Sequence, residues 1–325
     1  MKKYFVGGDV GGTKTHVVIA DEHGHLAGFG QSSGGNHETV GYDGLARAVG
    51  EAFNEAVVSA DLSIDQIAGA GFGIGGYDWN SQRKDHLRAI ATLGLQAPVE
   101  IVNDAILGLL AGSESGWGVA VVSGTGCNCW GWNQERKRTG RVTGMGTLMG
   151  EGAGASELIH KAVQMVSHEW TKRGPATALT PAFIRFAGAE NLEDLIEGYC
   201  TGRYDLGSAA APLVFIAAEA GDEVARSLVR WAGTELGELV NAVIRQLDLE
   251  SLEFDVIMIG SMFQNGSLLT KPMLETIQAV AVGAHLKGLT APPVTGGLLL
   301  AMEVAGLKPD ASIRTALFHS TSQLK

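Results

Sequence analysis

The stretch Gly8-Asp9-Val10-Gly11-Gly12-Thr13-Lys14-Thr15 lies between two apolar runs, at residues 4–6 and 15–20. Two extended runs joined by glycines predict a β-hairpin. Small residues at its tip leave backbone N–H groups uncovered, with a carboxylate, hydroxyls and a lysine close by. This combination suits a phosphate oxygen and a bound metal ion. An ordinary glycine-rich turn would use the same residues, so the rest of the chain must decide between the two interpretations.

Two common phosphate motifs do not fit this stretch. A Walker loop needs glycine directly before its Lys-Ser/Thr pair, and Thr13 occupies that position. The dinucleotide fingerprint G-x-G-x-x-G is supplied neither by residues 7–12 nor by residues 124–129. Any phosphate site must therefore follow another pattern.

Composition and charge limit the class of protein. A chain of 325 residues, 45% of them hydrophobic, is long enough for two domains. Its net charge of −11 argues against nucleic acid and anionic membranes as partners. Three cysteines, at 127, 129 and 200, cannot form a disulfide framework, and no apolar run suits a signal peptide or a membrane span. We therefore expect a cytoplasmic protein.

The first third of the chain predicts a mixed sheet. After the opening hairpin, a third strand is expected at 25–30, followed by an amphipathic helix at 42–60, a strand at 69–74, a helix at about 80–93 and a strand at 99–102. The last strand ends at Asn103-Asp104. The order βββαβαβ, with carboxylates after its first and last strands, resembles a ribonuclease-H-like lobe.

The pattern then restarts. A helix at 105–111 is followed by a glycine- and serine-rich boundary at 112–116, a strand at 117–122, the turn Ser123-Gly124-Thr125-Gly126, a strand at 127–132 and an extended run near 137–142. The repeated hairpin predicts two related lobes, 1–114 and 115–325, that face each other across a cleft. The second lobe is otherwise mainly helical, with helices expected near 155–170, 181–187, 191–198, 208–220 and 222–247. A buried strand at 254–259 ends in Gly260-Ser261, and a helix is expected after Gly296-Gly297.

With these pieces in place the chain resembles the superfamily of sugar kinases, actin and heat-shock chaperone ATPases. Within it, the chain is similar to the N-acetylglucosamine kinase branch of the BadF/BadG/BcrA/BcrD ATPase family, whose other members activate benzoyl-CoA reductase. The resemblance runs nearly end to end, and the number and order of its motifs support it more than any single one. It implies an α/β fold of two ribonuclease-H-like, actin/hexokinase-type lobes around a central ATP and sugar cleft. The motifs are residues 8–15, Asn36-His37, 75–78, 103–105, 123–128, 150–154, Gly260-Ser261 and Gly296-Gly297.

The resemblance implies ATP and Mg²⁺ as cofactors. Phosphoryl transfer depends mostly on positioning and charge neutralisation, so glycine-rich hairpins should hold the phosphates while a carboxylate holds the metal. Asp9 suits Mg²⁺, directly or through water. The implied ATP-binding residues are Gly11, Gly12, Thr13, Lys14, Ser123, Gly124, Thr125, Gly126, Gly260 and Ser261.

A sugar hydroxyl is too weakly acidic to ionise alone, so a carboxylate must accept its proton during attack. The resemblance assigns this general base to Asp104, whose alternative interpretation is a simple helix N-cap. Sugar recognition would fall to Asn36, His37, Asp78, Asp104, Asn128 and Glu151. Where the family usually has Gly-Asp-Glu-Gly, this chain has Gly150-Glu151-Gly152-Ala153. This departure leaves the identity of the sugar open.

The expected activity is ATP-dependent phosphorylation of an amino sugar, with N-acetylglucosamine giving its 6-phosphate as the first candidate. Glucosamine, glucose and N-acetylmannosamine are alternative acceptors. An ATPase switch without sugar chemistry is the alternative of another class, although Cys127, Cys129 and Cys200 do not match the paired cysteines of such proteins. A silent sugar sensor would not need both Asp9 and Asp104. The resemblance also implies a homodimer.

Overall fold

The opening hairpin is present in the computed structural model, which describes residues 2–324. Strands β1 (Tyr4–Val10) and β2 (Lys14–Asp21) pair antiparallel, with Val10 opposite Thr15. The turn between them is therefore residues 11–13, as the sequence predicts, with Gly12 and Thr13 exposed.

This hairpin is the centre of a five-stranded sheet. Its order is β3-β2-β1-β4-β5, with β3 (Leu26–Ser33) antiparallel to β2. Strands β4 (Ile67–Ile74) and β5 (Val99–Asn103) run parallel to β1, so the carboxyl ends of β1, β4 and β5 share one edge. Helix α1 (His37–Ala60) connects β3 to β4, and α2 (Arg83–Ala91) connects β4 to β5. The predicted order βββαβαβ is confirmed, and α3 (Asp104–Gly112) follows directly.

Helix α1 begins five residues before the expected start. The Asn36 side chain caps it by accepting the N–H of Glu38 at 2.9 Å. Gly41, with φ 68° and ψ 174°, then interrupts the helical backbone. The predicted sugar-binding residues Asn36 and His37, which we call the sugar loop, are therefore the N-cap and the first residue of a kinked helix.

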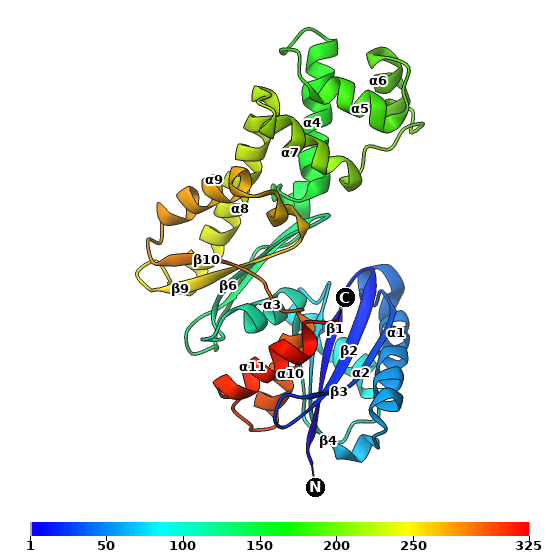
Figure 1. Cartoon of the computed structure of the whole chain (residues 1–325), viewed down its shortest axis with the longest axis vertical. Helices are drawn as coiled ribbons and strands as arrows, with labels where there is room; N and C mark the ends of the chain where they lie inside the picture. The colour runs from blue at the N-terminus through cyan, green and yellow to red at the C-terminus, as the bar shows by residue number, and fades with distance from the viewer. Residues whose placement is uncertain (1, 325) are drawn as a thin grey trace. The chain divides into compact units, whose positions relative to one another are not determined.

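The two faces of the sheet carry different helices. Val6, Val10, Val17 and Ile19 pack on one face against α1, whereas Phe5, Val18 and Ala20 pack on the other. That second face is covered by α10 (Val294–Val304) and α11 (Ala311–Thr321), as Figure 1 shows.

The C-terminal segment thus belongs with the N-terminal sheet. The chain forms two compact units, one of residues up to 120 together with those from 287 onward, the other of residues 121–286. This differs from the expected division into 1–114 and 115–325. The reason is that one face of the sheet would be exposed without α10, whose run Val294–Met302 is buried throughout.

Glycines let α10 lie directly on the strand backbone. A methyl group on Gly7 of β1 would lie 2.6 Å from the Leu298 nitrogen, and one on Gly71 of β4 would lie 2.5 Å from the Gly297 oxygen. Gly296 and Gly297 therefore lie inside α10, whereas the sequence predicts a helix that begins after them. A methyl group on Gly296 would reach the Leu107 oxygen of α3 at 2.1 Å.

The second sheet has the order β10-β9-β6-β7-β8. Its strands are β6 (Gly118–Ser123), β7 (Cys127–Trp132), β8 (Thr139–Arg141), β9 (Phe254–Ile259) and β10 (Ala284–Gly288). The helices are α4 (Ala155–Trp170), α5 (Leu179–Ala187), α6 (Leu192–Cys200), α7 (Ala211–Glu219), α8 (Glu223–Leu247) and α9 (Ser267–Gln278). The sequence predicts neither strand β10 nor helix α9. Short 3₁₀ helices are η1 (Ile64–Gln66), η2 (Asn80–Gln82), η3 (Gly146–Met149), η4 (Ser208–Ala210) and η5 (Ser261–Asn265).

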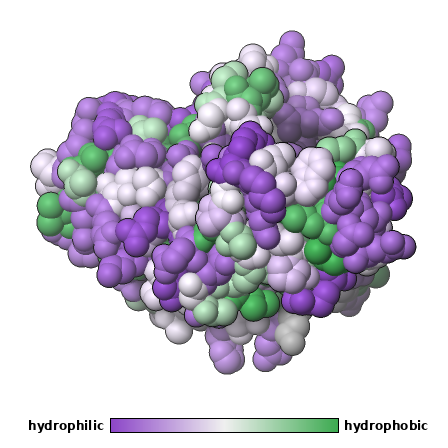
Figure 2. Space-filling model, turned by 90° about the horizontal axis from the view of Figure 1, so that it is seen from above, coloured by the Kyte–Doolittle hydropathy of each residue, from purple (hydrophilic) through white to green (hydrophobic). Residues whose placement is uncertain are grey.

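Large apolar side chains at the surface are scattered. The face in Figure 2 is mostly hydrophilic, with separate apolar areas. Among residues 2–324, no helix combines the length and the hydropathy needed to span a bilayer.

Candidate active site

The hairpin tip presents bare backbone. Gly11 donates its N–H to the Lys14 oxygen at 3.0 Å and accepts the N–H of Gly35 at the same distance, so the turn is held from both sides. Gly12 has open space where a side chain would be, and Gly12, Thr13 and Lys14 are exposed. This turn combines uncovered amides with a cation, the arrangement expected of an anion site.

Asp9 lies at the carboxyl end of β1, on the sheet face that α10 covers, because it follows Phe5 and Gly7 at the alternating positions. Its neighbours across the sheet are His16 on β2 and Gly73 on β4. Burial and the charge of Asp104 raise the pKa of Asp9 from 3.8 to about 7, against an opposing contribution from Lys14. Ionising both carboxylates at once is therefore unfavourable, because they are poorly hydrated and repel each other.

Asp104 is the first residue of α3. Asn103 is the N-cap, and its Oδ1 accepts the N–H of Ala105 at 3.0 Å. Asn103, and not Asp104, is thus the N-cap of α3, so the alternative interpretation of Asp104 as a simple N-cap does not hold. Oδ1 of Asp104 also accepts the Ala105 N–H, at 2.9 Å, while Oδ2 lies 3.2 Å from where a methyl group on Gly75 would be. Burial raises the pKa of Asp104, as suits a proton acceptor.

The sugar loop and the loop after β4 lie together. Gly76, with φ 80°, has no room for a side chain, since a methyl group there would lie 2.4 Å from Asn36 Oδ1. Asp78 accepts Asn103 Nδ2 at 3.1 Å through its Oδ1. His37 is half-buried and faces Gln82 at 3.3 Å. The structure thus brings Asn36, His37 and Asp78 into one part of the first unit.

In the second unit, three glycine-rich segments lie together. Ser123 Oγ donates to the Ala153 oxygen at 2.7 Å, and Ala155 at the start of α4 donates to the Gly124 oxygen at 2.8 Å. A methyl group on Gly260 would lie 2.2 Å from the Ser123 oxygen. The turn keeps Thr125 and Gly126 exposed, with open space at Gly126. The predicted ATP residues of this unit, which are Ser123, Gly124, Thr125, Gly126, Gly260 and Ser261, are therefore neighbours.

Asn128 and Glu151 differ in what they leave unsatisfied. The Oδ1 atom of Asn128 is buried and has no hydrogen-bond partner within the described residues. A buried acceptor of this kind favours a bound ligand or water. Glu151 is buried and fully engaged. Its carboxylate accepts the Thr143 N–H at 2.7 Å, the Thr143 hydroxyl at 2.9 Å and the Met145 N–H at 2.9 Å. It organises the segment before η3.

Neither the cysteines nor the described cavity adds a group to the predicted site. Burial raises the pKa of the Cys127 thiol to about 11, and its sulfur accepts the Ala153 N–H at 3.3 Å. A cavity of about 360 Å³ lies between α8 and α9, lined by Arg226, Val229, Arg230, Ser267, Leu268, Lys271, Pro272 and Glu275. None of the predicted site residues belongs to that lining.

The residues that fit a divalent cation are Asp9 and Asp104. Among residues 2–324, no group of three His, Cys, Asp or Glu side chains could hold a metal alone. Mg²⁺ is usually held by one or two carboxylates together with substrate phosphates, which does not require such a group. Burial and, after it, the charge of Asp104 raise the pKa of Asp9, and a bound cation would offset both.

Three polar residues behind the site were not among the predicted site residues, namely the half-buried Gln82 and the buried His86 and Asn103. Asn103 stands beside a predicted catalytic residue, and capping by Asn before a helix is the signal that could have identified it. The contact of Gln82 with His37 carries no local signal, because the two residues lie 45 positions apart in the chain.

Comparisons with known proteins give the family of the chain. The model of the BadF/BadG/BcrA/BcrD ATPase family matches residues 6–301. The N-acetyl-D-glucosamine kinase of Dictyostelium discoideum is 28% identical over 317 residues, which cover 93% of this chain and 98% of that protein. The N-acetylmuramic acid/N-acetylglucosamine kinase of Clostridium acetobutylicum is 29% identical over 267 residues, which cover 81% and 86%.

A solved structure of a candidate N-acetylglucosamine kinase from Chromobacterium violaceum gives a TM-score of 0.66 at 22% identity, covering 92% of this chain and 98% of that one. This likeness confirms the expected α/β fold. Because the family model extends over most of the sequence, the chain belongs to the BadF/BadG/BcrA/BcrD ATPase family.

Proposed function

We propose that the protein transfers the γ-phosphoryl group of ATP to an amino sugar, with N-acetylglucosamine as the first candidate and its 6-hydroxyl as the acceptor. Family membership supports the use of ATP. Both curated relatives are named as kinases of N-acetylated amino sugars, and each is matched over most of its length.

The observation that carries the proposal is the pair of half-buried carboxylates, Asp9 and Asp104, beside an exposed glycine hairpin. Phosphoryl transfer needs charge neutralisation at the phosphates and a base at the acceptor hydroxyl. Two carboxylates that cannot both ionise easily can divide these roles. Asp9 suits the cation, directly or through water, and Asp104 suits the acceptor.

Asp104 would accept the proton of the attacking hydroxyl through Oδ2. Its Oδ1 is held by the Ala105 N–H, which fixes the carboxylate plane at the start of α3. Burial raises its pKa, so the carboxylate holds a proton more readily than a solvated one. The absence of a side chain at Gly75 keeps space beside Oδ2.

Mg²⁺ bound at Asp9 would neutralise phosphate charge. The exposed amides of Gly12 and Thr13 and the Lys14 ammonium would bind phosphate oxygens in the first unit. The turn Ser123–Gly126 would contribute further amides, and Gly260 with Ser261 would lie against the nucleoside. Each of these assignments predicts a loss of ATP affinity when the backbone at that position is altered.

Sugar recognition would involve Asn36, His37, Asp78 and Asn128. Asn128 supports this assignment best, because its buried Oδ1 has no partner among the described residues and a sugar N–H or O–H would provide one. Glu151 would act through the segment that it holds rather than by direct contact.

The test is ADP release with Mg-ATP across glucose, glucosamine, N-acetylglucosamine, N-acetylmannosamine, N-acetylmuramic acid and a blank without sugar. Strong stimulation by one amino sugar supports the proposal and names the substrate. ADP release that no sugar stimulates would instead favour an ATPase switch.

Replacement of the base sharpens the test. Asp104→Asn should lower kcat by about 10²–10⁴-fold. The exposed Asp65→Asn makes the same chemical change on η1 and should leave kcat unchanged. Near-normal turnover of Asp104→Asn would exclude Asp104 as the base.

A further inference from the structure

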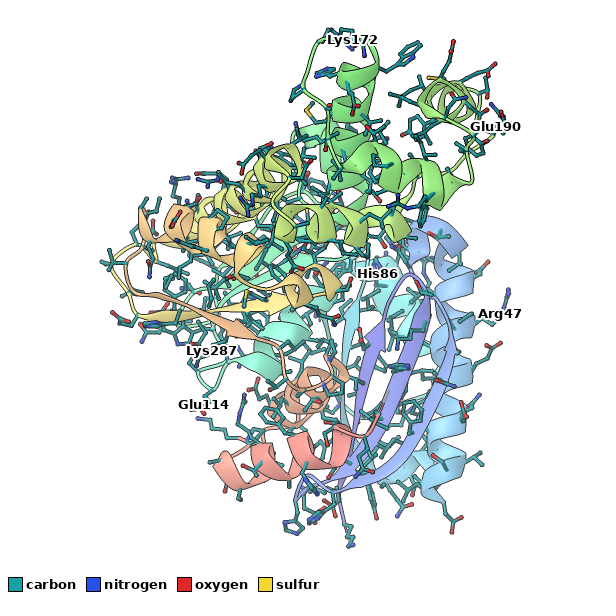
Figure 3. All side chains as sticks on the ribbon, turned by 45° about the horizontal axis from the view of Figure 1, so that its top comes forward. Arg47, His86, Glu114, Lys172, Glu190 and Lys287 are labelled. Atoms are coloured by element: carbon teal, nitrogen blue, oxygen red, sulfur yellow. The ribbon has the colours of Figure 1, made fainter. Side chains whose placement is uncertain are left out.

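Four aromatic side chains form a cluster behind the sugar loop, which we call the imidazole cluster: His37, Tyr42, Tyr77 and His86. The His37 ring stacks on Tyr42 at 4.8 Å between ring centroids and meets His86 edge-on at 4.6 Å. His86, on α2 and labelled in Figure 3, is fully buried. The cluster joins α1, α2 and the loop after β4.

Gln82 determines which nitrogen of His37 carries the proton. Its Oε1 accepts the N–H groups of Asp78 at 3.1 Å and of Trp79 at 3.0 Å, so the opposite atom is the amide NH₂. That NH₂ lies 3.3 Å from His37 Nε2. Since it can only donate, His37 Nε2 must be an unprotonated acceptor, and the proton of the neutral ring is on Nδ1.

His86 is determined in the same way. Its Nδ1 lies 2.9 Å from the main-chain oxygen of Gln82, to which it must donate. Its Nε2 is buried without a partner among the described residues, and burial lowers the pKa of the ring, so Nε2 is unprotonated. His37 Nδ1 and His86 Nε2 are both buried, and neither has a partner among the described residues. Both rings are therefore neutral in this arrangement, and their tautomers are specified.

The hydrogen bonds continue to the base. Asn103 Nδ2 donates to the Tyr77 oxygen at 3.3 Å and to Asp78 Oδ1 at 3.1 Å. Asn103 Oδ1 caps α3, which begins at Asp104. A continuous path thus runs from His37, next to Asn36, through Gln82 and the loop after β4 to the catalytic helix.

We propose that Gln82 is a positioning residue for the sugar site. Through His37, Gln82 holds Asn36 against the loop that positions Asp104, and it does so only while His37 is neutral. The proposal rests on the proposed function, in that Asn36 and Asp104 are assigned there to the sugar. It makes sugar affinity depend on pH through a residue that does not react.

Protonation would reverse the polarity of the contact. A proton on His37 Nε2 would face the Gln82 NH₂, so that two donors oppose each other. Turning the amide over would satisfy His37, but the NH₂ would then face the N–H groups of Asp78 and Trp79. In either arrangement an N–H donor faces another donor across the Gln82 side chain, which removes a hydrogen bond that the neutral ring makes.

Burial, rather than nearby charge, favours the neutral state of His37. Burial lowers the pKa of His37, opposed by Glu38 of α1, and burial likewise lowers that of His86. The other titratable groups facing the cluster are Tyr42 on α1, Arg83 on α2, and Tyr77 and Asp78 on the loop after β4. Glu38 is the only described anion among the causes acting on His37.

The test compares wild type with Gln82→Glu. A carboxylate still accepts the N–H groups of Asp78 and Trp79, but it now requires a proton on His37 Nε2. The control is Gln96→Glu, which makes the same charge change at an exposed site. A second variant, Gln82→Met, removes all three side-chain contacts.

In wild type, the KM for the sugar should rise about tenfold between pH 7.5 and pH 5.5. In Gln82→Glu it should stay nearly constant, and in Gln82→Met it should be raised at every pH. The effect of pH on kcat should be the same in wild type and Gln82→Glu, because Asp104 is unchanged. Gln96→Glu should follow wild type. Identical KM profiles in wild type and Gln82→Glu would overturn the proposal.

Nitrogen-15 NMR of the histidine rings provides a readout that needs no turnover. Wild-type His37 and His86 should both carry the proton on Nδ1, and His37 should switch to Nε2 in Gln82→Glu. A wild-type His37 with its proton on Nε2 would overturn the proposal even in an active kinase. Conversely, if no sugar is phosphorylated, the proposed function fails while the tautomers still report on Gln82.

Discussion

Replacing Asp9 by Asn should make the first unit more stable at pH 8 and leave its stability unchanged at pH 4. Burial and Asp104 raise the pKa of Asp9 to about 7 in the folded protein, against 3.8 for an ordinary aspartate. Between these two values the folded state keeps a proton that the unfolded state has lost. The free energy of unfolding of wild type therefore falls as pH rises through this interval.

The magnitude follows from the pKa difference. Each pKa unit corresponds to about 1.4 kcal/mol, so the full difference is worth at most about 4 kcal/mol above pH 7. Asn carries no proton, so the Asp9→Asn variant should be more stable than wild type by up to that amount at pH 8. If Mg²⁺ binds at Asp9 as proposed, saturating Mg²⁺ should stabilise wild type and reduce the difference, because the cation would bind the folded carboxylate and not the amide.

The assay is the urea-denaturation midpoint from pH 4 to pH 8.5, with and without Mg²⁺, together with hydrogen exchange of the β1 amides. Asp104→Asn should retain most of the pH dependence, since burial is the larger cause of the shift at Asp9. The exposed Asp65→Asn should match wild type. Parallel pH profiles for wild type and Asp9→Asn would refute the reasoning.

Three further changes test other parts of the structure. Glu151→Gln should place an NH₂ against the donors of Thr143 and lower the free energy of unfolding by about 2–3 kcal/mol, measured by urea denaturation. Gly7→Ala should force α10 away from β1, because its methyl group would lie 2.6 Å from the Leu298 nitrogen, at a cost of about 1–3 kcal/mol in thermal unfolding. Burial raises the pKa of Asp21, but the N–H groups of His25 and His23 outweigh it and hold the pKa below 3.8. The Asp21→Asn variant should therefore lose about 1 kcal/mol of the free energy of unfolding above pH 4, and this loss should vanish at lower pH, as urea denaturation would show.

The strands of the first sheet could be predicted because each signal is local. Alternating apolar residues and glycine turns specify β1 and β2, and α1 shows its apolar period within the helix itself. Its true start was missed because Asn36 caps the helix before an interrupting glycine at position 41. The periodic part of the helix begins only after that residue.

The placement of the C-terminal segment could not be predicted in the same way. Helix α10 is apolar on all sides, a pattern that indicates burial without naming the surface that it covers. What selects β1 and β4 is the lack of side chains at Gly7 and Gly71, more than 200 residues earlier in the sequence. Such complementarity between distant segments is visible only in three dimensions.

At the site, residues that carry similar sequence signals differ in their hydrogen bonding. Asn128 and Glu151 were both expected to bind sugar, yet Asn128 keeps a buried oxygen unpaired while Glu151 uses its carboxylate within its own loop. A motif identifies residue types and spacing, but not whether their hydrogen-bonding capacity is already used. The same limit concealed Gln82, whose role depends on the direction of its amide.

The glycines of the first sheet and the repulsion at Asp9 have one physical origin. Because Gly7, Gly71 and Gly73 carry no side chains, α10 and α3 lie close to the strands, and Asp104 at the start of α3 is drawn toward the strand ends. The same close packing removes water from Asp9 and raises its pKa to about 7. A protein selected for stability alone would replace one carboxylate. The pair is reasonable if a cation joins it during the catalytic cycle, because the repulsion then becomes affinity for the cation.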